Sequence, residues 1–384
     1  MRKNYWLVLL GVTLLLAGGP WQQVAEAGGI RNYGYMDTKS NRTYVPIRYL
    51  SEQLKYSVAW NEQAQEITVS KEQNKIILTI GKKTAIWNDN TIQVDAAPFV
   101  RGGVTYVPIR VMIDAMNLPL EWDKSGSTLV FQNGEQPSKL PIISLEREVS
   151  SQPITKKQQT FNVGQKQIKA TILQIDLLSK DIQLGVAVAN NKIGTVDSLK
   201  HMATVNNAVA AMNGTYFDAY SNTGIQNPFG YIVQNGTVVN KSPGDKRSVL
   251  VFTKDNQVEI LSGQDFQIRV KEGQIYGALQ AGPRLVTNGE VKVDPATEGF
   301  RDPKILTNSG SRSAVGVTRD HKLILVTIPG AKVTELAQVM LQVDAYQAMG
   351  LDGGASSGLY YQGSYLTSPG RELSNALLIY QSKS

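Results

Sequence analysis

The chain has 384 residues and no cysteine, 42% of its residues are hydrophobic, and its formal net charge is +7. This length exceeds one ordinary hydrophobic core and predicts two domains, while the lack of cysteine excludes disulfides and thiolate metal sites. The basic residues are scattered and form no nucleic-acid motif, so we expect an anionic surface or glycan as partner and no nucleic acid.

The amino-terminal segment has the pattern of a secretory signal. Two basic residues, Arg2 and Lys3, precede an apolar run, and the AEA sequence that ends at Ala27 fits an A-x-A cleavage site. The alternative is an uncleaved anchor, although the run is shorter than the ~20 residues that a spanning helix needs. We expect residues 1–27 to form a signal peptide, and the mature protein to be secreted or associated with the cell envelope after cleavage near Ala27.

A doubled sequence follows. The stretch YVPIRYLSEQLKYSVAW begins at Tyr44, and YVPIRVMIDAMNLPLEW begins at Tyr106. Each copy predicts a strand, an amphipathic helix and a further strand, with both helices packed on one small sheet. The doubled YVPIR resembles the amino-terminal, or stalk, domain of copper amine oxidases, which occurs on many secreted proteins of Gram-positive bacteria. The resemblance implies a small, repeat-built α+β domain over residues 28–135.

Two interpretations of this stalk-like domain remain open. Its basic and aromatic residues either bind anionic cell-wall polymer or serve only the core and the solvated surface. The family name is no evidence for copper, because no histidine or cysteine precedes His201. No cofactor is required by the sequence. With His201 and His321 as the only histidines, any metal would be a hard, oxygen-ligated divalent cation such as Ca or Mg.

The rest of the chain predicts a linker and a larger domain. Residues 132–159 are polar and contain prolines, as in NGEQPSKLP and SSQPITKKQQ, which is typical of a linker or an entry strand, and we expect a linker at 136–159. In residues 160–384, strands are predicted at 167–176, 182–190, 207–213, 229–239, 248–256, 313–328, 346–353 and 375–380, and helices at 195–205 and 332–343. Mixed strands with two helices indicate an α+β fold built on a mixed sheet.

Four stretches of the larger domain place glycine beside polar residues where an apolar strand ends. They read AMNGTYFD, QAGPRLVTNG, GSRSAVG and GLDGGASSG. Each alone is a turn signal. Together they indicate strand ends at which a ligand approaches the backbone, where free N–H groups hold anionic oxygens.

The ordered stretches MNGTYF, QNPFGYIVQNG, GPRLVTNG, SRSAVG, LDGGASS and RELSNALL resemble the phosphodiester glycosidase family, over roughly residues 160–380. The resemblance implies a hydrolase that cleaves sugar-1-phosphodiesters, here on cell-envelope glycans or glycopolymers. Two residues depart from the family pattern. Thr215 stands where the family often has a second glycine, and Ala355 replaces the third glycine of DGGGS. Both changes are small, so they bear on substrate fit more than on the reaction.

Under this resemblance the catalytic candidates are Asp352, Arg312 and Asn213. Asp352 would stabilise an oxocarbenium-like sugar as nucleophile, base or electrostatic partner. Arg312 would hold the phosphate through two parallel donors, and Asn213 would supply a neutral hydrogen bond. Further candidates for substrate binding, with no metal ligand among them, are Gly214, Tyr216, Asp218, Arg284, Gly353, Gly354, Ser356 and Arg371.

Purely structural roles remain open for these residues, and other functions remain open for the chain. Asp352 would otherwise be a turn aspartate, Arg312 a structural ion-pair residue and Tyr216 a core residue. A non-catalytic wall-binding or glycan-binding protein would not need Asp352 as an acid. Ordinary glycoside hydrolysis would need a second carboxylate ~5 to 10 Å from Asp352.

Overall fold

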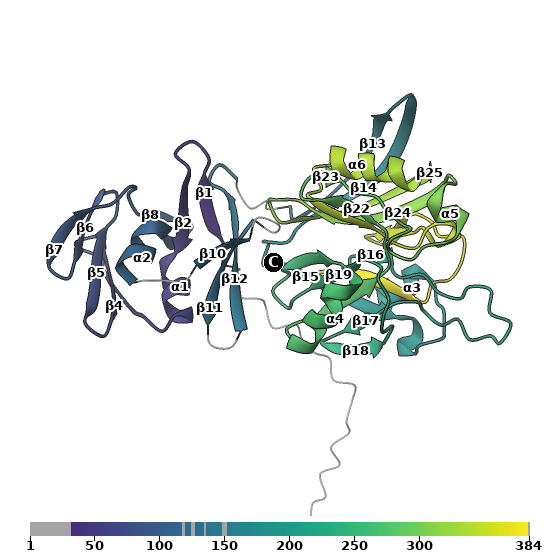
Figure 1. The fold of residues 1–384 in the computed structure, drawn as a ribbon, viewed down its shortest axis with the longest axis horizontal. Coiled ribbons are helices and arrows are strands. Elements are labelled where there is room, and N and C mark those ends of the chain that lie inside the picture. Colours follow the sequence, from purple (N-terminus) through teal and green to yellow (C-terminus); the bar gives the residue numbers. More distant parts are fainter. Residues whose placement is uncertain (1–31, 117–119, 124–126, 134–135, 148–151, 383–384) are drawn as a thin grey trace, which may run out of the picture.

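The structure is a computed structural model that describes residues 32–116, 120–123, 127–133, 136–147 and 152–382. The expected signal peptide, residues 1–27, lies outside the described residues. Within the described ranges, no helix is long and apolar enough to cross a membrane. Figure 1 shows two domains side by side, both built mostly of strands with few helices.

The first domain contains two sheets. Its seven-stranded sheet has the order β10-β11-β12-β1-β2-β9-β8, and its five-stranded sheet runs β3-β4-β5-β6-β7. The strands of the first sheet are β1 (Gly34–Asp37), β2 (Arg42–Pro46), β8 (Phe99–Arg101), β9 (Val104–Pro108), β10 (Leu120–Asp123), β11 (Thr128–Asn133) and β12 (Gln136–Ser144). Those of the second are β3 (Ser57–Asn61), β4 (Glu66–Lys71), β5 (Asn74–Thr79), β6 (Thr84–Trp87) and β7 (Asn90–Gln93).

The doubled sequence forms a pseudo-symmetric centre in this domain. Strands β2 and β9 pair antiparallel, with Val45 opposite Val107, and these two residues occupy equivalent positions in the two copies. Helices α1 (Ile47–Gln53) and α2 (Ile109–Met116) follow these strands, and both contact the β2–β9 pair. The strands after the helices diverge, because β3 joins the five-stranded sheet and β10 the seven-stranded one.

The segment 136–159 differs from the expected linker, because it holds most of two strands. Strand β12 pairs antiparallel with β11 and parallel with β1, and β13 (Ile154–Val163) forms a long hairpin with the next strand. Proline fits in β12 for a physical reason. Pro137 and Pro141 pair only with β11, since the bonding to β1 starts at Ile142, and proline is tolerated where one side of a strand has no partner.

Three sheets build the second domain. The seven-stranded sheet has the order β13-β14-β25-β24-β26-β22-β23, and the two five-stranded sheets run β15-β29-β16-β27-β28 and β18-β17-β21-β19-β20. The first contains β14 (Lys166–Asp176), β22 (Arg284–Thr287), β23 (Glu290–Val291), β24 (Gly310–Val317), β25 (Lys322–Ala331) and β26 (Gln347–Gly350). The second contains β15 (Ile182–Val188), β16 (Ala210–Asn213), β27 (Leu359–Tyr361), β28 (Ser364–Thr367) and β29 (Asn375–Gln381). The third contains β17 (Ile232–Gln234), β18 (Thr237–Asn240), β19 (Val249–Phe252), β20 (Val258–Leu261) and β21 (Gly277–Gln280).

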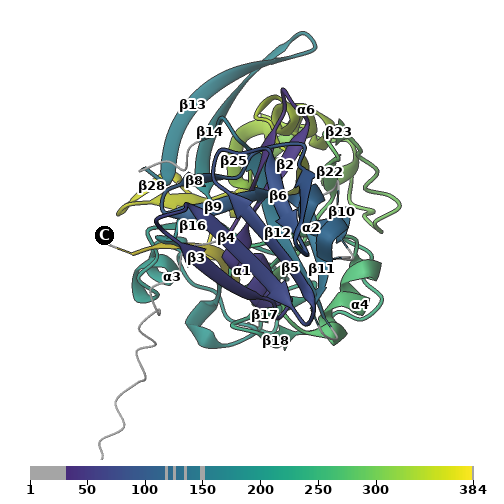
Figure 2. The ribbon, with the colours of Figure 1, turned by 90° about the vertical axis from the view of Figure 1, so that its left-hand side faces the viewer.

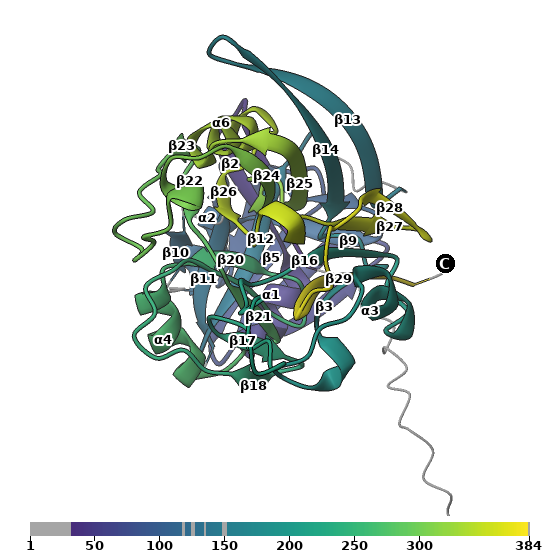
Figure 3. The same cartoon turned by 90° about the vertical axis from the view of Figure 1, so that its right-hand side faces the viewer.

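The three sheets share one hydrophobic core. Leu173 of β14, Leu250 of β19 and Leu377 of β29 are fully buried in the same cluster, although they come from three different sheets. Four helices lie around the sheets, namely α3 (Leu199–Val205), α4 (Gly263–Glu272), α5 (Pro303–Leu306) and α6 (Val333–Gln342). Figure 2 looks onto the first domain, and Figure 3, from the opposite side, shows the β13–β14 hairpin projecting past the larger domain.

Candidate active site

Segments from two sheets meet beside Asp352. β16 ends at Asn213 in a five-stranded sheet, and β26 of the seven-stranded sheet ends just before Asp352. The buried Asn213 amide joins them, because its Nδ2 donates to the Asp352 carbonyl oxygen at 2.7 Å. Its Oδ1 accepts hydrogen bonds from Ser313 Oγ at 2.8 Å and from Gly358 N at 3.0 Å. We therefore infer that Asn213 positions the Asp352 loop instead of contacting a ligand.

Asp352 is a partly exposed carboxylate with local hydrogen-bond donors. Gly353 N donates to Oδ1 at 2.9 Å, and the Ser356 side chain also hydrogen-bonds the carboxylate. Burial raises the pKa of Asp352 to about 6, against the lowering effect of Ser356, Gly353 and the charge of Arg371. At neutral pH the group is therefore mostly ionised, and it changes charge within a mildly acidic range.

Arg312 is a buried cation without a carboxylate partner. Its Nε donates to Ala331 O at 2.9 Å, and its Nη2 donates to Lys304 O and Asn308 O, both at 2.7 Å. Within the described part of the chain, no carboxylate lies within 4.0 Å of the guanidinium and Nη1 has no hydrogen bond. Burial lowers the pKa of Arg312 from its ordinary value. Nη1 faces Gly353, since a Cβ added there would lie 3.6 Å from it.

Tyr216 lies among these charges. Its hydroxyl donates to Gly282 O at 3.0 Å, and its ring packs edge-on against Phe300 with centroids 5.7 Å apart. Burial raises the pKa of Tyr216 far above the ordinary phenol value. The charges of Asp352, Arg247 and Arg312 also act on this hydroxyl, which places all three around one side chain.

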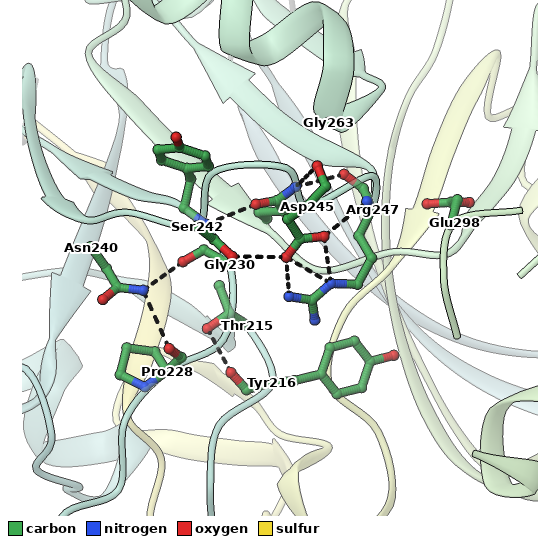
Figure 4. Close-up of polar contacts among 12 residues, drawn as sticks. Thr215, Tyr216, Pro228, Gly230, Asn240, Ser242, Asp245, Arg247, Gly263 and Glu298 are labelled. Atoms are coloured by element: carbon green, nitrogen blue, oxygen red, sulfur yellow. Dashed lines mark hydrogen bonds and ion pairs between the residues drawn. The ribbon is translucent and has the colours of Figure 1, made fainter. Parts of the chain in front are cut away.

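Arg247 is a site residue that the sequence did not single out (Figure 4). Its Nε donates to both carboxylate oxygens of Asp245, at 2.9 and 3.1 Å, and its Nη2 also pairs with Asp245. The guanidinium carbon lies 5.9 Å from the centroid of the Tyr216 ring. In sequence, Asp245 and Arg247 belong to SPGDKRS, a turn pattern with mixed charges, so no local signal marks either residue.

Glu298 anchors residues 298–304, the segment that runs from the Tyr216 ring to the Arg312 guanidinium. Its Oε2 accepts a hydrogen bond from Ser248 N at 2.7 Å, and its Oε1 accepts one from Arg284 N at 2.5 Å. Residues 299–302 follow, and α5 then supplies one of the carbonyl oxygens that hold the Arg312 guanidinium. Glu298 is thereby anchored to two main-chain amides and serves to hold this segment.

A pocket adjoins Tyr216. It has a volume of ≈ 450 Å³ and is bounded by two stretches of chain, 228–247 and 299–302. Arg247 and Phe300, which both contact the Tyr216 ring, line it. Its volume lies within the ~300–1,000 Å³ typical of small-molecule sites.

Of the three predicted glycines, Gly214 and Gly353 lie where another segment approaches the backbone closely, and Gly354 does not. A Cβ on Gly214 would lie 1.9 Å from Asn375 Oδ1, so a side chain does not fit there. Gly353 uses its amide to bind the Asp352 carboxylate, whereas Gly354 is exposed and has a φ of +59°. Only Gly353 is shown in an anion-holding contact, and the anion is the protein's own carboxylate.

The remaining candidate residues differ in how near they lie to Asp352. Arg371 lies near Asp352, whose pKa it lowers, and its Nη2 donates to the exposed Tyr220 hydroxyl at 3.0 Å. Asp218 is exposed on the loop after Tyr216. The Arg284 guanidinium donates instead to Ile260 O at 2.6 Å and to Gln347 Oε1 at 3.3 Å. It therefore binds β20 and the start of β26, whereas Asp352 follows the end of that strand.

No cluster of three or more His, Cys, Asp or Glu side chains suited to a metal ion occurs in the residues that the structure describes. What the fold assembles instead is two arginines near Tyr216, Arg312 and the Asp245-paired Arg247, together with Arg371 near the Asp352 carboxylate. Arginine is suited to planar, two-point recognition of phosphate or carboxylate. Such side chains are chemically suited to bind an anion.

Comparison with known families agrees with this class of site. Residues 206–380 match the family model described as phosphodiester glycosidase, and residues 34–131 match that of the copper amine oxidase N-terminal domain. Both resemblances drawn from the sequence are thereby confirmed.

Two solved structures share the fold. The catalytic domain of zebrafish N-acetylglucosamine-1-phosphodiester alpha-N-acetylglucosaminidase, auto-inhibited by its pro-peptide, matches with a TM-score of 0.51 and 19% identity, covering 61% of this chain and 86% of that one. A hypothetical protein from Synechocystis matches with a TM-score of 0.53 and 15% identity, covering 91% and 96% respectively. A comparison with curated protein sequences gave no match. Family and fold together support a hydrolase of the phosphodiester glycosidase kind.

Proposed function

We propose that this chain is an exported hydrolase that cleaves sugar-1-phosphodiesters of cell-envelope glycans or glycopolymers. The observation that carries the proposal is the state of Arg312. A buried guanidinium held only by three carbonyl oxygens keeps its full charge and has no anionic partner among the described residues. Because burying an unpaired charge costs several kcal/mol, such a group is kept where a bound anion completes it.

The proposed reaction breaks the bond between the anomeric carbon and the phosphate oxygen. The electron pair of that bond stays on the phosphate oxygen, and the departing phosphomonoester binds to Nη1 of Arg312. Asp352, as a carboxylate, stabilises the positive charge that develops on the sugar ring. The oxygen of a water molecule then bonds to the anomeric carbon, and the proton that this water loses passes to a base or to solvent. Phosphate is a good leaving group, so a strong general acid is not needed.

The arginines favour a phosphodiester over an ordinary glycoside. Two nearby carboxylates have their oxygens engaged elsewhere, because Glu298 accepts from two main-chain amides and Asp245 pairs with Arg247. Ordinary glycoside hydrolysis would need a second free carboxylate as acid or base. Arg312 and Arg371, which form no ion pair with a carboxylate in the described residues, suit a negatively charged leaving group instead.

The proposed location and the role of the first domain follow from the sequence. The signal-like residues 1–27 favour export, and the basic stalk-like domain suits retention on an anionic wall polymer. The residues that we assign to chemistry all lie after Asn213, so this domain is not expected to take part in the reaction. A hard divalent cation such as Ca or Mg remains compatible with an anionic substrate and is tested below by chelation.

A release assay tests the proposed function. The mature chain is incubated with a panel of sugar-1-phosphodiesters, with and without chelator, and the freed sugar and phosphomonoester are quantified. Asp352→Asn should lower kcat by orders of magnitude. Arg312→Lys keeps the charge but loses the planar fork, so kcat/KM should fall ~10–100-fold.

An exposed lysine provides the matched control. Lys157→Ala, on the exposed face of β13, should leave both products unchanged. Near-normal turnover by Asp352→Asn would remove the central residue of the proposal. Binding of glycan without release of either product would instead identify a non-catalytic glycan-binding protein.

A further inference from the structure

We infer that the pocket beside Tyr216 is a second anion subsite, which binds the next charged group of a polyanionic glycan while Asp352 and Arg312 act on one phosphodiester. The inference rests on the proposed function and extends it, because it makes the substrate an oligomer with repeated negative charges. The subsite consists of Lys241, Arg247 and Arg301 together with the walls formed by Phe229 and Phe300.

The charge of the pocket is the first observation. Lys241, Arg247 and Arg301 line it, and Asp302 is the one carboxylate among the described lining residues. One Asp302 oxygen is already used, since Oδ1 accepts a hydrogen bond from Lys304 N at 2.8 Å and caps α5. The lining carries three positive charges and one negative charge, and since Asp245 balances Arg247, one net positive charge remains. Such a pocket attracts anions from solution.

The three cations have donors to spare. Asp245 orients Arg247 but leaves its Nη1 without a hydrogen bond in the described residues. Lys241 and Arg301 are exposed, and within the same residues neither forms an ion pair. A polar scaffold also holds the pocket open, because Asn240 Nδ2 donates to Gly230 O at 2.6 Å and to Pro228 O at 3.3 Å (Figure 4).

Tyr216 links the pocket lining to the loop that carries Asp352. Tyr216 packs against Arg247 and Phe300 on the pocket side, and Gly214, two residues before it, accepts a hydrogen bond from Asp352 N at 3.1 Å. The chain gives a second connection, since Arg301 lies three residues before Lys304, whose carbonyl holds Arg312. A ligand in the pocket and a ligand on Arg312 are thus neighbours on one substrate path.

The walls indicate a glycan as the carrier of the second charge. Phe229 is 47% exposed on one side of the pocket, and Phe300 is buried on the other. Aromatic faces suit the apolar faces of sugar rings, while the arginines and Lys241 suit the charges between them. A neutral sugar or a short neutral aglycone would gain nothing from the charges of Lys241 and Arg301.

The test compares ligands of one length and different charge. Fluorescently labelled trisaccharides, one phosphodiester-linked, one built of uronic acids and one neutral, are titrated into wild-type protein and into the Lys241→Ala/Arg301→Ala double variant. The wild type should bind at least one anionic trisaccharide about tenfold or more tighter than the neutral one. The double variant should lose most of that difference. The two anionic arms show whether phosphate or carboxylate supplies the charge.

Turnover separates this inference from the proposed function. On the phosphodiester trisaccharide, the double variant should lose at least fivefold more kcat/KM than it loses on a single sugar-1-phosphodiester. Lys157→Ala removes an exposed charge on β13, outside the pocket lining. It should change neither the preference for anionic trisaccharides nor the difference in kcat/KM between the two substrates. Equal binding of neutral and anionic trisaccharides by the wild type would overturn the subsite. If no substrate is cleaved but the anionic preference holds, the proposed function fails while the subsite stands.

Discussion

At the scale of single residues, the site contains one buried and one partly buried charge, which are stabilised in different ways. Asp352 has nearby donors in Gly353 and Ser356, yet burial still raises its pKa to about 6. Arg312 has only main-chain carbonyl oxygens, and no carboxylate compensates its charge in the described structure. Both charged groups are less stable in the folded protein than in water. A phosphate bound to Arg312 would relieve the cost for the guanidinium, and an oxocarbenium-like sugar beside Asp352 would relieve the cost for the carboxylate.

The raised pKa of Asp352 predicts how activity depends on pH. If Asp352 acts as a carboxylate, kcat/KM for a sugar-1-phosphodiester should fall about tenfold per pH unit below a midpoint near the pKa of about 6. The profile is measured on a substrate whose phosphodiester stays ionised throughout. An activity that rises as the pH falls through this range would instead identify Asp352 as a proton donor.

The same pKa predicts a gain in stability on removing the charge. Because the folded pKa lies above the reference value of 3.8, the stabilising contribution is complete below pH 3.8 and is lost as the pH rises through about 6. Asp352→Asn should therefore raise the free energy of unfolding by about 1–3 kcal/mol at neutral pH and by little in strong acid. Urea unfolding at several pH values measures this, with the exposed Asp89→Asn as control. Destabilisation at neutral pH would contradict the prediction.

At the scale of elements, periodicity predicted the parts whose apolar faces are strong. The helices expected at 195–205 and 332–343 occur as α3 and α6, and the strand ends at Asn213 and Asp352 lie where the pattern placed them. Helix α4 was missed because its buried face is small: Phe266 is buried but Ile268 is 63% exposed. Polar composition hid β12 and β13, since β12 begins with polar residues and prolines and most of β13 is exposed.

Site residues could be predicted from the sequence only where they lie within an apolar strand or shortly after its end. Asp352 and Arg312 lie at strand ends or within a strand and carry glycine-rich neighbours, which the sequence makes visible. Arg247 reaches the site through its pairing with Asp245 and the close approach of Tyr216, which are tertiary contacts. Arg284 had an equally suggestive sequence context, yet the fold turns its side chain toward Ile260. No local pattern distinguishes these two arginines.

The segment of residues 298–304, which Glu298 anchors, gives a testable prediction. In Glu298→Gln, one amide group must face Ser248 N or Arg284 N, where both partners are donors, so a hydrogen bond is lost. The free energy of unfolding should fall by about 1–3 kcal/mol, and KM for a sugar-1-phosphodiester should rise because Phe300 and Arg301 move. Glu290→Gln, which alters only a surface ion pair with Lys292, should change neither quantity. Unchanged stability of Glu298→Gln would show that this carboxylate does not hold the segment.

At the scale of the whole molecule, the two domains are joined by charged and polar contacts. Arg147 pairs with Asp176 at 2.7 Å, both side chains being at most 7% exposed, and also donates to Asp320 O. Lys139 of β12 pairs with Glu259 of β20 at 2.9 Å. We propose that the boundary lies between β12 and β13, so a catalytic fragment that begins at residue 160 would remove part of β13. Docked domains of this kind are expected to separate when one buried contact fails.

His321 provides a way to separate them by acid. Hydrogen bonds link it to the backbone of Ser127 and Ile142 in the first domain, and burial lowers its pKa to about 4, with Arg147 lowering it further and Asp320 opposing. Since this folded pKa lies below the reference value of 6.5, the stabilising contribution is present above pH 6.5 and is lost as the pH falls through about 4. The interface should therefore weaken by about 1–3 kcal/mol across this range.

The experiment is a pH titration of the radius of gyration by small-angle X-ray scattering, together with calorimetry. Wild-type protein should expand, and one thermal transition should split into two, as the pH falls from 6.5 toward 4. His321→Gln stays neutral and should lose most of this pH dependence, while His201→Gln, which changes an exposed helix residue, should keep it. Asp352 acts in the opposite direction over the same range, because its protonation stabilises the larger domain, so repeating the titration in Asp352→Asn isolates the interface. An expansion that is equal in wild type and His321→Gln would mean that carboxylates, and not His321, control the docking of the two domains.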